Sequence, residues 1–215
     1  DILSSAEYQF VNALDLGNRF SVDLERRFVT RAFFPNDLID SRTANIDTWN
    51  DFDGSEADAV NAKLYMRSTP DDPAGSNPAW GAWREFVSGT FKDRGFQFKA
   101  ELNSSDVAQN ILIDELGYTA TLQRRQENSN GAIASGAATK VVSFDKPFFT
   151  GTASLGGTNA YLPSVGVTVQ NLGAGERVNV HGVTGTTFNV AILDSSDNNV
   201  DRNFTYTAVG YGKAV

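Results

Sequence analysis

The acidic segment "NDFDGSEAD" at residues 50–58 offers oxygen ligands at the close spacing that a hard cation accepts. Its carboxylates belong to Asp51, Asp53, Glu56 and Asp58, and Ca²⁺ is bound by groups of this kind. An EF-hand loop is excluded, because placing Gly54 at the sixth position puts Trp49 at the first position, which must supply a ligand. A calcium site of another kind and a solvated acidic turn both stay open as interpretations.

A second candidate is the aromatic segment "NPAWGAWREFVSGTFKDRGFQFKAEL" at residues 77–102, which contains Trp80 and Trp83. Together with Trp49 and Tyr65, these rings could stack on the apolar face of a sugar, since an aromatic ring with a polar rim suits a pyranose. We therefore predict ligand binding at these four residues. The alternative is that Trp80 and Trp83 close one end of a β-sandwich as part of its core.

Patterns typical of catalysis are missing from the sequence. His181 is the only histidine, and no G-x-S-x-G turn is present to carry a serine nucleophile. Glycoside hydrolysis needs two carboxylates at a fixed separation, but nothing in the sequence distinguishes two of the 26 acidic residues. We expect no enzyme, no catalytic residue and no cofactor, apart from the calcium that residues 50–58 could bind.

The composition excludes several classes of partner. The formal net charge is −8 and the isoelectric point is about 4.6, which argues against nucleic acid, whose phosphates require a basic surface. The same charge argues against anionic membranes, and no apolar run approaches the roughly 20 residues of a membrane helix. Cysteine is absent, which excludes disulfides. Because the chain opens at Asp1 rather than at Met, we expect it to be a piece of a longer protein.

Alternation of apolar and polar residues predicts β-strands at 19–31, 60–67, 94–102 and 116–122. In residues 94–102, for example, Phe96, Phe98 and Ala100 would face a core, while Gln97 and Lys99 would face outward. Residues 35–58 are too long for a plain turn. We expect them to form an ordered functional loop or an interface arm.

The chain is expected to form two domains. Residues 1–125 would be a jelly-roll-like β-sandwich. Residues 126–138 are small and polar, which is typical of a linker or a long exposed loop. Residues 139–215 contain short strands separated by turn signals such as "LGAGE" and "DSSDNN", and they would form a small antiparallel sandwich of about six strands. The predicted fold class is all-β, with two tandem antiparallel sandwiches.

Several segments resemble known families. "YQFVNALDLGNRFSVDL" at residues 8–24 is similar to the opening of discoidin-like, galactose-binding-like jelly rolls. Residues 139–212 resemble the six-stranded sandwich of H-type lectins, although "FDKPFFTGTAS" has Pro147 without the second proline usual there. A resemblance that spans nearly the whole chain is to the C-terminal region of phage tail hub proteins. It is carried by "DLIDSRTANIDTWNDFDG" (37–54), "LYMRSTPDDPAGSNPAWGAWREF" (64–86) and "DRGFQFKAEL" (93–102).

This last resemblance implies a tail-tip, host-attachment component of a long-tailed phage. Such a protein would be a homotrimer in the virion, would contact other tail proteins, and would act outside the cell on a surface glycan or another receptor. It supplies no catalytic residue. The alternatives are a carbohydrate-binding module of a bacterial enzyme, a virion scaffold that touches no receptor, and a depolymerase.

Overall fold

The computed structural model describes residues 3–34, 43–48 and 57–215, which fold as an all-β protein of antiparallel sheets. The prediction of an all-β sandwich fold is confirmed. The first sandwich contains strands β1 (Ser5–Gln9), β2 (Leu14–Phe33), β3 (Val60–Thr69), β4 (Arg84–Glu85), β5 (Gly89–Ser104), β6 (Asn110–Leu122) and β14 (Lys213–Ala214). The second contains β7 (Arg124–Asn128), β8 (Ile133–Ala134), β9 (Lys140–Ser143), β10 (Ser164–Val169), β11 (Arg177–His181), β12 (Thr187–Leu193) and β13 (Asn203–Tyr211). Within the described ranges, the only helical element is one 3₁₀ turn at Ile46–Thr48.

A single long strand builds both layers of the first sandwich. The 20 residues of β2 pair with β5 over their first half, and with β6 from Val22, opposite Leu122, to Phe33, opposite Asn110. On the other edge of β5 lies β3, which is followed by the short β4. The seven-stranded sheet therefore curls over on itself and encloses a core.

The core of the first sandwich consists of the residues that the alternation pattern placed inward. Phe96, Phe98 and Ala100 on β5 are fully buried, as are Leu64 and Met66 on β3. Burying such side chains is the main stabilising contribution to folding. The complete buried cluster is Leu14, Leu16, Phe20, Val22, Leu24, Leu64, Met66, Phe86, Phe96, Phe98, Ala100 and Phe149.

The second sandwich packs one sheet, in the order β10-β13-β7 with β8 also on β13, against another in the order β11-β12-β9. Its buried side chains are Val142, Phe144, Phe148, Phe188, Val190, Ile192, Phe204, Tyr206 and Ala208. The short strands predicted between turn signals in residues 139–215 are present as β9, β10, β11, β12 and β13.

The structure corrects the prediction of a linker at residues 126–138. Strand β7 pairs with β13 from Arg124, opposite Tyr211, to Asn128, opposite Thr207, and β8 pairs with β13 as well. The segment looks polar because the β7 side chains that turn inward are Arg125 and Glu127. The Arg125 guanidinium lies over the Phe148 ring, 3.7 Å from its centroid, and also binds the Glu127 carboxylate at 2.9 Å. These residues are therefore an integral part of the second sandwich.

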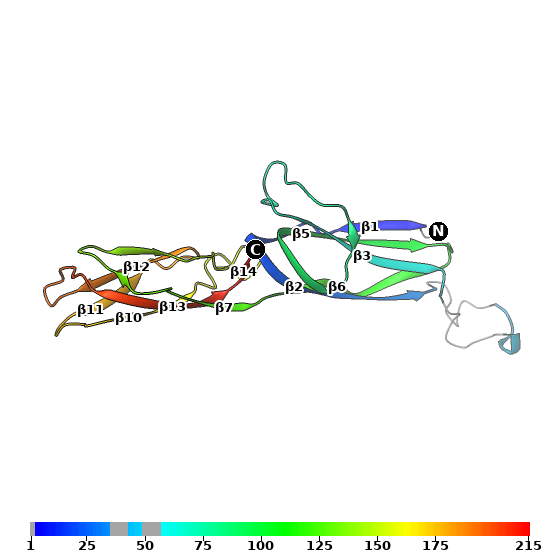
Figure 1. Ribbon diagram of the computed structural model, residues 1–215. Helices are drawn as coiled ribbons and strands as arrows, with labels where there is room; N and C mark the ends of the chain where they lie inside the picture. The colour runs from blue at the N-terminus through cyan, green and yellow to red at the C-terminus, as the bar shows by residue number, and fades with distance from the viewer. Residues whose placement is uncertain (1–2, 35–42, 49–56) are drawn as a thin grey trace.

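The two sandwiches lie end to end and meet at a joint that involves several chain segments (Figure 1). After β13 the chain returns to the first sandwich, where Lys213 of β14 lies opposite Ser21 of β2. Phe149 from the second half is buried in the first core, edge-on to Phe20 at 5.9 Å. The Thr152 hydroxyl donates to the carbonyl oxygen of Asp15 at 2.7 Å. These contacts fix the two sandwiches against one another.

Gly212 makes this close approach possible. A Cβ atom at this position would lie 2.9 Å from Phe149 Cβ and 2.9 Å from two ring carbons of Phe20, and the residue has φ +88°. Both the space and the backbone conformation therefore require glycine.

Candidate functional site

Strands β3 and β5 bring the predicted aromatic residues together on the outer face of the first sandwich. Tyr65 and Arg67 alternate along β3 with the buried Leu64 and Met66, so they face away from the core. In the antiparallel register, Tyr65 lies opposite Lys99 and Arg67 lies opposite Gln97. Side chains directly opposite one another are close enough to interact. The register therefore places two cations beside the aromatic rings.

Cations and rings alternate in a row that we call the cation–aromatic ladder: Trp80, Arg67, Trp83, Lys99 and Tyr65. The Arg67 guanidinium carbon lies 5.1 Å from the ring centroid of Trp80 and 4.6 Å from that of Trp83. The Lys99 ammonium lies 5.1 Å from the Trp83 centroid and 5.7 Å from that of Tyr65. All four distances lie within the range of cation–π attraction.

Hydrogen bonds and ion pairs within the sheet hold both cations in place. Arg67 donates from Nε and Nη2 to Gln97 Oε1, at 2.9 and 2.7 Å. Lys99 Nζ bonds the carboxylates of Glu101 at 2.6 Å and Glu7 at 2.9 Å. The hydrogen bond to Glu101, followed by that to Glu7, raises the pKa of Lys99. Lys99 therefore keeps its charge over the physiological pH range.

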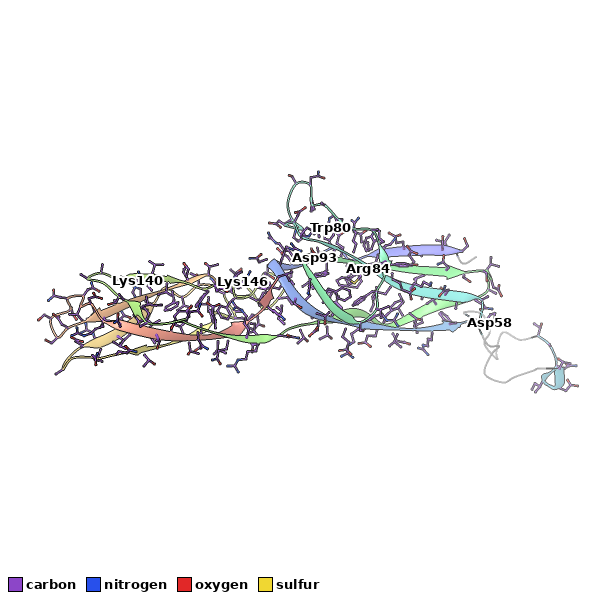
Figure 2. All side chains as sticks on the ribbon, in the orientation of Figure 1. Asp58, Trp80, Arg84, Asp93, Lys140 and Lys146 are labelled. Carbon is purple, nitrogen blue, oxygen red and sulfur yellow. The ribbon has the colours of Figure 1, made fainter. Side chains whose placement is uncertain are left out.

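The ladder also fixes the loop that carries both tryptophans, residues 70–83, which rises from the sheet in Figure 2 with Trp80 at its base. The Gly81 N–H donates to the Ser68 carbonyl at 2.9 Å, and the Ala79 N–H donates to Asp71 Oδ2 at 2.8 Å. Asp72 in the loop pairs with Arg94 of β5 at 2.9 Å. The loop is thus held at both ends as well as by the ladder.

This geometry matches neither of the simple expectations for the tryptophan pair. Trp80 and Trp83 are half-buried on the outer face and do not belong to the buried core cluster, which corrects the interpretation that they close the core. They are not bare platforms either, because cations of the same chain lie over their rings. A sugar that stacks on Trp83 would have to compete with Arg67 and Lys99. Ligand binding at Trp80, Trp83 and Tyr65 stays a prediction.

The acidic candidate lies mostly outside the described residues. This holds for Asp51, Asp53 and Glu56, for Trp49, and for most of the 35–58 segment. Asp58 is described and exposed, and it lies at the far end of the first sandwich from the joint, well away from Trp80 (Figure 2). Over residues 3–34, 43–48 and 57–215, no group of three or more acidic or histidine side chains could hold a metal ion. A calcium site at 50–58 stays a prediction.

A polar network lies inside the second sandwich around Glu127. Burial alone would raise the pKa of this carboxyl, but the Asp145 N–H at 2.8 Å, the Arg125 guanidinium and the Tyr206 hydroxyl outweigh it and lower the pKa. Tyr206 donates to Glu127 Oε1 at 3.0 Å, and burial together with this hydrogen bond raises the pKa of Tyr206 to about 12. A general acid for glycoside hydrolysis needs a raised carboxyl pKa, so Glu127 is suited to holding β7 rather than to acid catalysis. The single histidine, His181, is exposed at the end of β11.

Two members of the ladder, Arg67 and Lys99, were not singled out in the sequence. Their charges fall at the outward positions of two alternating strands, but the sequence does not say which strand lies beside which. The signal that could have found them is the spacing of Tyr65 and Arg67, which puts an aromatic ring and a cation on the same face of β3.

Comparisons with known proteins identify no relative. No protein-family model matches the chain, and neither a curated protein nor a solved structure matches it. Among the residues that the structure describes, none of the helical segments is long and apolar enough to cross a membrane.

Proposed function

We propose that this chain is a tail-tip or hub component of a long-tailed phage that acts in host attachment by binding a cell-surface glycan or another receptor. The proposal rests on the resemblance of residues 37–54, 64–86 and 93–102 to phage tail hub proteins. The last two of these segments form most of β3, the 70–83 loop, β4 and most of β5. They therefore include every residue of the cation–aromatic ladder. The chain would act in the virion as a homotrimer, outside the cell, and in contact with other tail proteins.

The observation that carries a binding role is the fixed joint between the two sandwiches. Because β14 pairs with β2 and Phe149 enters the first core, the two units form one elongated body (Figure 1). An elongated body presents loops in fixed directions, so little ordering entropy is lost on binding. Three copies on one spike would raise a weak single-site affinity through effective concentration.

The test is binding of the purified chain to an array of bacterial surface polysaccharides, with its mass measured by light scattering in the same buffer. We expect a trimer and selective binding to a subset of the polysaccharides. A heat-denatured sample serves as the control for non-specific adsorption. A monomer that binds no polysaccharide would refute the proposal, whereas a monomer that binds would favour a carbohydrate-binding module of a bacterial enzyme.

A virion scaffold is the second candidate, and the ladder is the observation that favours it. Arg67 and Lys99 already lie over the rings that a receptor glycan would use. In a scaffold, the ladder face would pack on a further copy of the chain or on another tail protein. Two results together would support the scaffold over receptor binding. The well-folded trimer would bind no polysaccharide on the array, and it would dissociate when Trp83 is replaced by alanine.

A further inference from the structure

The joint between the sandwiches carries a solvent-open hollow that the proposed function does not yet use. Its volume is about 280 Å³, and it is lined by Ala120, Thr121, Leu122, Phe149, Leu155, Tyr161 and Tyr211. The first three belong to the end of β6 in the first sandwich, and Tyr211 ends β13 in the second. We call this hollow the joint pocket. Ligand sites occur preferentially at such boundaries between two packed units.

Three aromatic rings form the main wall of the joint pocket. Phe149 is buried and stacks on Tyr161, with centroids 5.9 Å apart and planes at 27°. Tyr161 meets Tyr211 edge to face at 6.1 Å. Both tyrosines are 42 % exposed, so each presents an apolar ring surface to whatever enters.

The chain holds Tyr161 in position even though it is exposed. Gly156 has φ +74°, and a Cβ atom there would lie 2.5 Å from both Cε2 and the hydroxyl oxygen of Tyr161. Glycine at this turn therefore lets the ring lie flat against the backbone. A surface tyrosine that is fixed in this way loses little conformational freedom when a ligand binds to it.

The rim of the joint pocket offers hydroxyl groups and no charge. Within the described part of the chain, the hydroxyls of Tyr161 and Tyr211 make no hydrogen bond to protein. A hydroxyl can both donate and accept. None of the seven described lining residues has an acidic or basic side chain. The pocket is thus suited to a neutral ligand with one apolar face and several hydroxyl groups.

We infer that the joint pocket binds a single neutral pyranose unit of a glycan. The C–H face of the sugar would lie on the rings of Tyr161 and Tyr211, and its hydroxyls would bond to the two free tyrosine hydroxyl groups at the rim. The volume lies near the lower limit of about 300 Å³ for small-molecule pockets, which suits one ring rather than an oligosaccharide. The inference deepens the proposed function, on which it rests for the source of the glycan.

An apolar side chain of a partner protein is the competing occupant. It would fill the aromatic part of the pocket but would leave the two tyrosine hydroxyls without partners once water is displaced. Buried polar groups without a partner weaken binding, so the rim favours a sugar.

The test is nuclear magnetic resonance on the ¹⁵N-labelled full chain, titrated with the methyl glycosides of glucose, galactose, mannose and N-acetylglucosamine. N-acetyl-leucine amide serves as a probe for an apolar side chain. We expect saturable shifts for at least one glycoside, confined to Ala120–Leu122, Phe149, Leu155, Tyr161 and Tyr211, with affinity in the millimolar range. Tyr161→Ala should weaken this binding about tenfold, which corresponds to one lost stacking contact of about 1.4 kcal/mol.

Two further variants keep the test independent of folding. Tyr211→Phe keeps the ring, removes a rim hydroxyl, and should weaken binding several-fold without changing the thermal midpoint. Tyr8→Ala removes a tyrosine of comparable exposure from β1, outside the joint pocket, and should leave glycoside binding unchanged.

The outcomes separate this inference from the proposed function. Polysaccharide binding on the array that survives both Tyr161→Ala and Tyr211→Phe would overturn the pocket and leave host attachment standing. Glycoside shifts at the pocket without any array binding would support the pocket and count against attachment. Shifts caused by N-acetyl-leucine amide and by no glycoside would overturn the sugar in favour of a protein partner.

Discussion

Replacing Trp83 by alanine should destabilise the first sandwich moderately, and its coupling to Arg67 should be measurable. The variant loses the contact between the Trp83 ring and the Arg67 guanidinium, which are 4.6 Å apart. Such a contact is worth about 0.5–1 kcal/mol at a partly exposed site. The variant also loses the free energy gained by burying the apolar surface of a half-buried tryptophan side chain. Together these losses predict a decrease of about 1–3 kcal/mol in the free energy of unfolding, which is less than the roughly 3–5 kcal/mol of a core aromatic.

A double-mutant cycle isolates the contact from the rest. Trp83→Ala, Arg67→Ala and the double variant should give an interaction energy of about 0.5–1 kcal/mol, because the loss of the Arg67–Gln97 hydrogen bonds cancels in the cycle. The assay is urea unfolding followed by tryptophan fluorescence. Trp80 and Trp83 both lie in the loop that precedes β4 of the first sandwich, so their fluorescence reports on that sandwich.

The control cycle pairs Trp83→Ala with Arg31→Ala. Arg31 lies opposite Leu112 in the other layer and forms no contact with the ladder, so this pair should be additive. An Arg67 cycle that is also additive within about 0.3–0.5 kcal/mol would refute the ladder. A single-variant loss above about 3 kcal/mol would instead restore the interpretation of Trp83 as a core residue.

Four other predictions follow from the joint and from the polar network. Gly212→Ala should destabilise the joint and lower the thermal midpoint strongly. Gly117→Ala is the control, because its Cβ would meet nothing within 4 Å, and it should change the midpoint little. Equal midpoints for the two variants would contradict the close approach at Gly212. Phe149→Ala should remove about 3–5 kcal/mol of stability and separate the unfolding of the two sandwiches in calorimetry; a single, slightly shifted transition would argue against the joint. The pKa of Tyr206 is raised to about 12, so its stabilising contribution is complete below pH 10 and is lost as the pH rises toward 12; spectrophotometric titration should show a late component that disappears in Tyr206→Phe. The pKa of Glu127 is lowered from 4.5, so the stability that its carboxylate contributes is present above that pH and is lost as the pH falls below it. Glu127→Gln should therefore flatten the acid limb of a stability–pH curve. An unchanged acid limb would contradict this role of Glu127.

The sequence predicted the parts of the fold that depend on local alternation. Phe96, Phe98 and Ala100 fall inside because period-2 patterning is a local property of a strand with one buried face. The short strands of the second half were readable for the same reason, since turn signals separate them. The prediction of a linker at residues 126–138 was wrong because the inward positions of β7 hold Arg125 and Glu127. These two side chains form an ion pair and do not follow the apolar pattern of a strand with one buried face.

The candidate site was only partly predictable. The sequence pointed to Trp80, Trp83 and Tyr65, but their arrangement depends on the register that puts Lys99 opposite Tyr65. That register is set by the whole sheet and not by any short segment. The joint pocket could not be predicted from the sequence either. Its walls come from β6, the 149–161 segment and β13, which are distant along the chain.

The return of the chain at the joint makes the second sandwich an insertion within the first. The chain leaves the first sandwich after β6 and comes back at Gly212, whose N–H donates to the Gln123 carbonyl at 2.9 Å. The outgoing and returning segments are thus neighbours, an arrangement that tolerates exchange of the inserted unit. The second sandwich can therefore be treated as an inserted domain that can be exchanged. A different sandwich spliced between Gln123 and Gly212 would leave the ladder and most of the first core unchanged. It would replace the contacts that Phe149 and Thr152 make with the first sandwich, and the part of the joint pocket formed by Leu155, Tyr161 and Tyr211.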